Sequence, residues 1–254
     1  MLLAVDIGNT TSVVGFFEGE ELKYRYSTRS DYGHSREEIS SSFSLFLKDK
    51  GIAKEELKEA IISSVVPSLG VIWKEILKEN YGIRPFVLGP RLKTGIAVRT
   101  DNPKEVGSDL IADAIGAKAL YEEDVLIADL GTANKIILLG KGGAFEGCTI
   151  GVGLGMAAKA LASDTAALPD VSLEIPAKVL GKNTADSMNS ALTYGFAAEI
   201  RGLCDMIEKE AGRPLKRVLT GGYGYRLNSL LPEFEFVPSL LLDGLRIAYS
   251  LNHK

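Results

Sequence analysis

Short apolar runs separated by turn residues open the chain and predict a β-sheet. The run LLAVDI at residues 2–7 carries Asp6 next to its end and leads into a glycine turn, and residues 11–29 predict two more strands around a Glu-Gly-Glu turn. Ser35–Lys50 combines a leading serine, early glutamates and apolar residues near helical spacing, so it predicts a helix that ends at Gly51. The elements expected next are a strand at 57–67, a helix at 71–82 and a short strand at 84–90.

The rest of the chain repeats this alternation of strands and helices. Residues 93–103 carry glycine and proline but no clear period, so we expect two halves, 1–105 and 106–254. The elements expected in the second half are a helix at 105–124, strands within 125–150, helical stretches at 153–162 and 184–211, a strand at 217–222, a helix from Tyr223, a strand at 234–238 and a helix at 240–251.

An internal repeat relates the two halves. An apolar strand delivers Asp-Ile-Gly-Asn-Thr at residue 6, and a second apolar strand delivers Asp-Leu-Gly-Thr-Ala at residue 129, which is a period of 129 − 6 = 123 residues. Two similar α/β halves facing each other would place both Asp-Gly turns at one cleft.

Composition narrows the function classes. Hydrophobic residues are 46% and charged residues 24% of 254, which is typical of a folded globular chain, and the formal charge of -4 argues against broad nucleic-acid binding. Cys148 and Cys204 form no CxxC pair, which favours a reducing cytoplasm over a disulfide or zinc framework. No export signal and no membrane span is expected. The chain has two histidines, His34 and His253, which offer a poor basis for a nucleophile activated by histidine. We therefore expect carboxylates and backbone groups to carry the chemistry.

The first Asp-Gly turn suits a nucleotide phosphate. Its glycine lets backbone N–H groups approach a ligand, and Asp6 offers the carboxylate that Mg²⁺ prefers beside phosphate oxygens. A plain hairpin turn is the alternative for one such turn, whereas its repetition favours the nucleotide. Thr220-Gly221-Gly222, between a strand and a helix, would let adenine or ribose lie against backbone, although a tight turn also explains it. No GxxxxGK[ST] sequence is present, which excludes a P-loop.

Asp109 stands at the start of a predicted helix, where the positive end of the helix dipole favours a carboxylate. A positioned Asp accepts the proton of a substrate hydroxyl in phosphoryl transfer, so Asp109 is the candidate general base. An ordinary first-turn acid is the alternative, and Asp113 on the same side is expected to be structural.

These residues resemble the type III pantothenate kinase family of the acetate and sugar kinase, Hsp70 and actin superfamily. The resemblance rests, in order, on DIGNT at 6–10, SSVVP at 63–67, NPKEVGSD at 102–109, DLGTA at 129–133, ALP at 167–169, GKNT at 181–184 and TGG at 220–222. It implies a duplicated RNase-H-like, actin-like ATPase fold around a nucleotide cleft. It also implies a homodimer that uses ATP to phosphorylate pantothenate to 4'-phosphopantothenate, the first step of coenzyme A biosynthesis.

The resemblance also implies roles for individual residues. The nucleotide contacts would be Asp6, Gly8, Asn9, Thr10, Thr11, Val13, Thr132, Gly221 and Gly222. Asp109 would be the catalytic base, Asp6 would hold Mg²⁺, and Asp129 would hold a monovalent cation, K⁺ or NH4⁺. The pantothenate contacts would be Thr100, Gly107, Ser108, Leu110, Thr165 and Thr184.

The departures from the family pattern gather on the acceptor side. Leu110 stands where the family has an arginine for the substrate carboxylate, Thr100 replaces an aromatic residue, Asp164 precedes Thr165 in place of a basic residue, and Val152 replaces a proline. Three hypotheses follow: a working pantothenate kinase, a kinase for another small hydroxyl compound, or an impaired paralogue that pairs with an intact chain.

Asn134 and Lys135 replace two threonines of the family pattern beside the second turn. Lys135 raises a further hypothesis, that its ammonium group replaces the monovalent cation. A surface lysine on an edge strand is the alternative.

Overall fold

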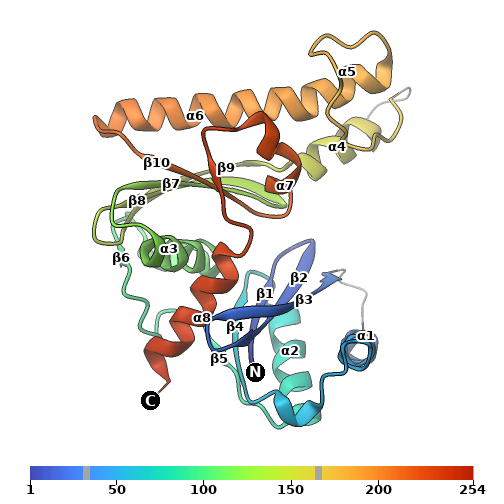
Figure 1. Cartoon of the computed structure of the whole chain (residues 1–254), viewed down its shortest axis with the longest axis vertical. Coiled ribbons are helices and arrows are strands. Elements are labelled where there is room, and N and C mark those ends of the chain that lie inside the picture. Colours follow the sequence, from blue (N-terminus) through green and yellow to red (C-terminus); the bar gives the residue numbers. More distant parts are fainter. Residues whose placement is uncertain (31–34, 164–167, 254) are drawn as a thin grey trace. The chain divides into compact units, whose positions relative to one another are not determined.

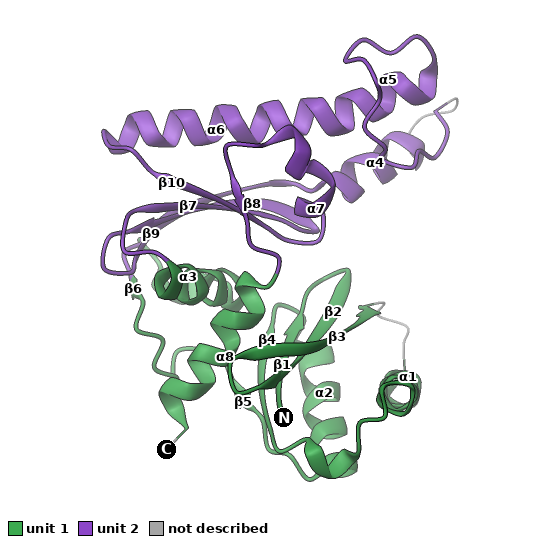
Figure 2. Cartoon of the chain, in the orientation of Figure 1, with its two compact units in different colours: residues 1–97, 101–120, 239–254 green, residues 98–100, 121–238 purple. Residues whose placement is uncertain are grey.

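The computed structural model describes residues 1–30, 35–163 and 168–253. The chain folds into two compact units, green and purple in Figure 2. Unit 1 comprises Met1–Ala97, Asp101–Leu120 and Ser239–Lys254, and unit 2 comprises Val98–Thr100 and Tyr121–Pro238. These bounds differ from the expected 1–105 and 106–254, because two helices that follow residue 105 pack on the first sheet.

Unit 1 is built around a five-stranded sheet of order β3-β2-β1-β4-β5. Its strands are β1 (Leu2–Ile7), β2 (Thr11–Glu18), β3 (Glu21–Arg29), β4 (Glu59–Ser64) and β5 (Phe86–Val87). β1 pairs antiparallel with β2 and parallel with β4, so the central strand is hydrogen-bonded on both sides. Every residue of β1 is buried except Asp6, which is half-buried at its carboxyl end.

Helices cover both faces of this sheet. They are α1 (Arg36–Lys50), α2 (Pro67–Tyr81), α3 (Ser108–Leu120) and α8 (Leu240–Asn252), with short 3-10 turns at Lys54–Glu56 and Pro103–Glu105. Leu3, Val5 and Ile7 of β1 pack with α1 and α2, whereas Leu2 and Ala4 pack with α3 and α8. The period of two along β1 therefore separates the two layers and puts Asp6 on the side of α3.

The ends of α1 agree with the sequence prediction. The Ser35 side chain accepts from the Glu38 backbone N–H, and the Glu38 side chain accepts from the Ser35 N–H, which completes a capping box. Gly51 ends the helix with φ 67°, a left-handed conformation that favours glycine. Residues 31–34, before the cap, lie outside the described part of the chain.

Unit 2 repeats the topology of unit 1. Its strands are β6 (Ala97–Val98), β7 (Val125–Leu130), β8 (Ala133–Gly140), β9 (Ala144–Val152), β10 (Lys216–Thr220) and β11 (Glu235–Phe236). The order is β11-β10-β7-β8-β9-β6, in which β7 pairs antiparallel with β8 and parallel with β10, as β1 does with β2 and β4. The predicted repeat is confirmed, and β6 adds an edge strand where the sequence predicted no element.

A long helix lies along one face of the second sheet (Figure 1). The helices of unit 2 are α4 (Leu154–Ser163), α5 (Thr184–Ser190), a π-helical segment (Ala191–Gly195), α6 (Phe196–Ala211), α7 (Gly224–Leu227) and a 3-10 turn (Asn228–Leu230). The helical stretch predicted at 184–211 is thus interrupted by the π-helical segment. Within the described ranges, no helix is long and apolar enough to cross a membrane.

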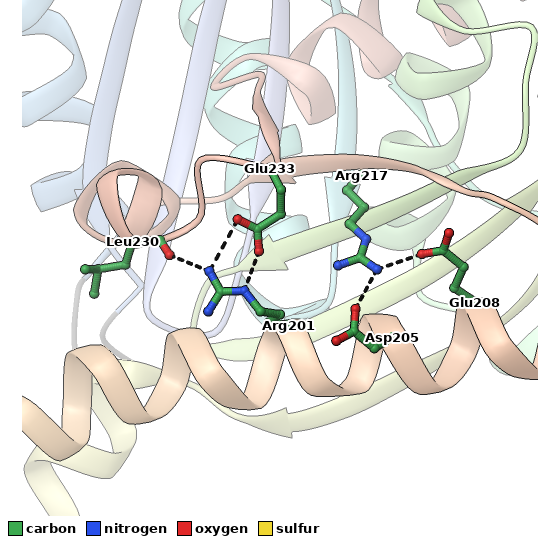
Figure 3. A network of polar contacts seen from close by, with 6 residues as sticks. All are labelled: Arg201, Asp205, Glu208, Arg217, Leu230 and Glu233. Carbon is green, nitrogen blue, oxygen red and sulfur yellow. Dashed lines mark hydrogen bonds and ion pairs between the residues drawn. The ribbon is translucent and has the colours of Figure 1, made fainter.

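Two arginines tie α6 to its surroundings (Figure 3). Arg217 on β10 donates to Asp205 and Glu208 of α6, each at 2.6 Å, and its side chain is only 16% exposed. Arg201 on α6 donates to Glu233 at 2.6 Å, and this hydrogen bond lowers the pKa of the Glu233 carboxyl from its usual value. The network fixes α6 against β10 and the segment before β11.

Helices α3 and α8 cross closely because glycines stand at the crossing. A Cβ on Gly244 of α8 would overlap the carbonyl oxygen of Ala112 in α3, and a Cβ on Gly116 of α3 would overlap the carbonyl oxygen of Leu240. Ala112 is completely buried, so the backbone there cannot move aside without disturbing the core.

We expect Gly244→Ala to lower the free energy of unfolding by about 1–3 kcal/mol, the usual cost of overpacking. Urea unfolding measures this value. Gly202→Ala in α6 is the matched control, because a Cβ there meets nothing within 4 Å, and it should be neutral or slightly stabilising. Equal stability of the two variants would show that the crossing is looser than described.

Candidate functional site

The first Asp-Gly turn joins β1 to β2. The Gly8 N–H donates to the Thr11 carbonyl at 3.1 Å, which closes the turn, while Asn9, Thr10 and Thr11 are exposed at its tip. Val13 follows on β2, half-buried and directly opposite Asp6. The turn therefore presents its polar side chains at the carboxyl end of β1.

The start of α3 is fastened to the same edge of the sheet. Asp6 on β1 lies directly opposite Ser63 on the parallel strand β4. The Ser63 and Ser108 hydroxyl oxygens are 2.9 Å apart, and the Ser64 N–H donates to the Ser108 hydroxyl at 3.2 Å. These bonds bring Asp109, the next residue, to the strand edge that carries Asp6. Ser63 was not among the predicted site residues, although the SSVVP segment that contains it was noted.

Asp109 lies in the first turn of α3, as predicted. Its Oδ1 accepts from the Leu110 N–H at 2.9 Å, so one carboxylate oxygen is oriented by the helix N-terminus. A Cβ on Gly107 would overlap that Oδ1, so a larger residue there would require the Asp109 carboxylate to move. Leu110 is only 5% exposed, so its side chain is almost completely buried.

Asp113, one turn further along α3, is completely buried. This placement fits the structural role expected for it.

The residues on this edge fit a magnesium ion shared with a phosphate. Among the described residues, no group of three or more His, Cys, Asp or Glu side chains could hold a metal ion. Mg²⁺ is usually held by one or two carboxylates together with substrate phosphates and waters. A half-buried Asp6 beside a turn of exposed hydroxyl and amide groups meets that description.

The second Asp-Gly turn joins β7 to β8 in the same way. The Gly131 N–H donates to the Ala133 carbonyl at 3.2 Å, and Thr132 is half-buried between them. Asp129 is directly opposite Lys135 on β8, and the Lys135 Nζ donates to Asp129 Oδ2 at 2.6 Å. An ion pair therefore joins the two strands next to this turn.

The Thr220-Gly221-Gly222 turn closes against this aspartate. Thr220 pairs with Asp129 across the parallel strands β10 and β7. Gly221 has φ 86°, and a Cβ there would overlap Asp129 Oδ1 and the Leu130 carbonyl oxygen. A Cβ on Gly222 would meet nothing within 4 Å, so open space lies beside its backbone.

The remaining predicted acceptor residues belong to unit 2. Thr100 is half-buried, and its hydroxyl oxygen is buried without a hydrogen-bond partner. Thr184 is exposed at the first position of α5, directly after the N-cap Asn183. Thr165 lies outside the described residues.

The cysteines stand apart from this chemistry. Cys204 of α6 points into the core of unit 2, and burial raises the pKa of its thiol to about 12. A thiol in that environment is a packing group rather than a nucleophile.

Two units with the same strand order, each with an Asp-Gly turn at the end of its central strand, form the duplicated RNase-H-like fold of actin-like ATPases and sugar kinases. Solved structures agree on the fold. The activator of 2-hydroxyisocaproyl-CoA dehydratase from Clostridium difficile, with bound ADPNP, has a TM-score of 0.56 at 14% identity and covers 98% of this chain and 94% of that chain. The polyphosphate/ATP-glucomannokinase of an Arthrobacter strain has a TM-score of 0.51 at 15% identity and covers 99% of each chain.

Sequence comparison gives the family. A family model described as type III pantothenate kinase matches residues 2–206. A type III pantothenate kinase of Dehalococcoides mccartyi is 39% identical, over 99% of this chain and 98% of its own length, and that of Moorella thermoacetica is 35% identical, over 99% and 100%. The chain belongs to the type III pantothenate kinase family and is a kinase, so the predicted resemblance and fold are confirmed.

We expect Gly221→Ala to lower the free energy of unfolding by about 1–3 kcal/mol, because the new methyl group meets both a left-handed backbone and the Asp129 carboxylate. Thermal unfolding measures the change. Gly222→Ala is the neighbouring control and should change stability by less than about 0.5 kcal/mol. Two variants of equal stability would contradict the close approach at Gly221.

Proposed function

We propose that this chain transfers the γ-phosphoryl group of ATP to a hydroxyl of pantothenate, giving 4'-phosphopantothenate, the first step of coenzyme A biosynthesis. Family membership supports this reaction. The observation that carries it is the Ser63–Ser108 link, which brings the start of α3 with Asp109 to the strand edge that holds Asp6. A metal-binding carboxylate and a candidate base at one edge are what phosphoryl transfer to a hydroxyl needs.

The residues of unit 1 receive two roles in this proposal. Asp6 holds Mg²⁺, and Gly8, Asn9, Thr10, Thr11 and Val13 contact the nucleotide. When bound, Mg²⁺ neutralises charge on the phosphate oxygens. Asp109 accepts the proton of the acceptor hydroxyl, and its Oδ1 is held in place by the Leu110 N–H.

Unit 2 carries further candidate nucleotide contacts. Thr132, Gly221 and Gly222 contact the nucleotide in this proposal. The open space beside Gly222 leaves room for a ligand against the backbone. Asp129 holds the monovalent positive charge of the site. The family resemblance assigns this charge to a bound K⁺ or NH4⁺ ion.

The proposed acceptor contacts are Thr100, Gly107, Ser108, Leu110, Thr165 and Thr184. Leu110 is buried and apolar, so it offers no charge to a substrate carboxylate. The loss of a charge-assisted contact weakens binding by about 1.5–3 kcal/mol. We therefore expect weaker pantothenate binding than an arginine at this position would give.

The apolar Leu110 also favours a second candidate function, phosphorylation of a small hydroxyl compound that lacks a carboxylate. An impaired paralogue that pairs with an intact chain is the third alternative. In the main proposal the chain is a homodimer that acts in the cytoplasm.

Release of ADP from ATP by the purified chain, with Mg²⁺ and with or without pantothenate, tests the proposal. We expect release that depends on pantothenate. Turnover with another hydroxyl compound in place of pantothenate would favour the second candidate. Binding of ATP without turnover would favour the impaired paralogue.

We expect Asp109→Asn to lower the turnover number on the order of 10²- to 10⁴-fold, because the amide cannot take up the hydroxyl proton. Steady-state ADP release measures this value. Asp49→Asn on the exposed side of α1 is the control and should keep the wild-type rate. An unchanged rate in Asp109→Asn would remove Asp109 from the role of base.

A further inference from the structure

Lys135 is an interior lysine rather than the surface lysine of an edge strand that the sequence left open. Its strand, β8, lies between β7 and β9 and is hydrogen-bonded to both. The Lys135 and Asp129 side chains are 15% and 8% exposed, whereas the Arg201–Glu233 pair of the same unit leaves 42% and 32% exposed. Lysine is seldom buried to this extent unless its charge is paired.

The pairing of the strands brings the two charged side chains together. In the antiparallel register Asp129 and Lys135 are direct partners, so both side chains leave the sheet on the same face. Leu126, Ala128 and Leu130 pack with α6, and alternation along β7 places Asp129 on the opposite face. Because both strands are inside the sheet, the ammonium group is delivered to the carboxylate from a rigid position.

The space around the carboxylate is narrow. The Lys135 ammonium lies 2.6 Å from Oδ2, and the Gly221 backbone approaches Oδ1 so closely that a Cβ would overlap it. A dissolved monovalent cation at Asp129 would have to displace an ammonium or lie beside one, and like charges repel strongly in a buried site.

We infer that Lys135 is the built-in monovalent cation of this site. Its ammonium group, not dissolved K⁺ or NH4⁺, supplies the positive charge at Asp129 beside the Thr132 and Gly221 turns. At constant ionic strength, nucleotide binding by this chain then does not depend on which monovalent cation is dissolved. The inference builds on the proposed function in placing ATP at these turns, but the ion pair can be tested without turnover.

The first experiment measures ATP affinity by calorimetry on the full chain with Mg²⁺. The salt is first tetramethylammonium chloride and then KCl or NH4Cl at the same ionic strength. The ATP dissociation constant of the wild type should change by less than about twofold between these salts. Lys135→Met should bind ATP about 10- to 100-fold more weakly in tetramethylammonium, the value of one or two charge-assisted contacts, and K⁺ or NH4⁺ should restore part of the loss.

Two control variants accompany this experiment. Lys141→Met removes an exposed lysine after β8 and should behave as wild type. Asp129→Asn combined with Lys135→Met removes both charges of the pair, so it should not recover in K⁺.

Thermal unfolding without nucleotide separates this inference from the proposed function. A cation that binds only the folded state raises the unfolding temperature, so K⁺ should raise it for Lys135→Met and leave wild type and the double variant unchanged. If pantothenate turnover fails but these responses hold, the proposed function is wrong and the built-in cation stands. A wild type that requires K⁺ or NH4⁺ to bind ATP, or that K⁺ stabilises as much as it stabilises Lys135→Met, overturns the inference.

Discussion

The structure depends on one constraint that occurs twice, a buried central strand whose last residue but one is an aspartate. β1 and β7 each have an antiparallel neighbour on one side and a parallel neighbour on the other, and their side chains, which point to both faces of the sheet, are buried except for the half-buried Asp6. The chain must leave such a strand through a tight turn, and the aspartate is carried to the carboxyl edge of the sheet. The positions of Asp6 and Asp129 follow from this arrangement of the strands.

The two equivalent aspartates have different partners. On the strand beside Asp6 stands Ser63, which links the sheet to the start of α3 and so to Asp109. Opposite Asp129 stands Lys135, and the carboxylate is neutralised inside the protein. The duplication thus gives both units the same arrangement of strands and turn. Differences in a few neighbouring side chains make Asp6 a half-buried carboxylate suited to a metal ion and Asp129 one partner of a buried ion pair.

The local signals of the sequence predicted most of the fold. Apolar runs, the capping box of α1 and the repeated Asp-Gly turns depend on neighbouring residues, so they can be identified without the tertiary structure. The placement of α3 and α8 on the first sheet could not be predicted, because it depends on the crossing of Gly116 and Gly244, far apart in the chain. The burial of Lys135 also depends on register, since a spacing of six residues places it opposite Asp129 only in this tight hairpin.

The central claim is that Asp6 binds a metal ion whereas Asp129 binds the Lys135 ammonium group. Anomalous diffraction tests this claim most directly. Crystals would be grown with a non-hydrolysable ATP analogue, Mn²⁺ in place of Mg²⁺ and Rb⁺ in place of K⁺. We expect a manganese peak at Asp6 and no rubidium peak at Asp129, with the Lys135 ammonium still on the Asp129 carboxylate. Rubidium bound to Asp129 with Lys135 turned away, or no manganese at Asp6, would contradict it.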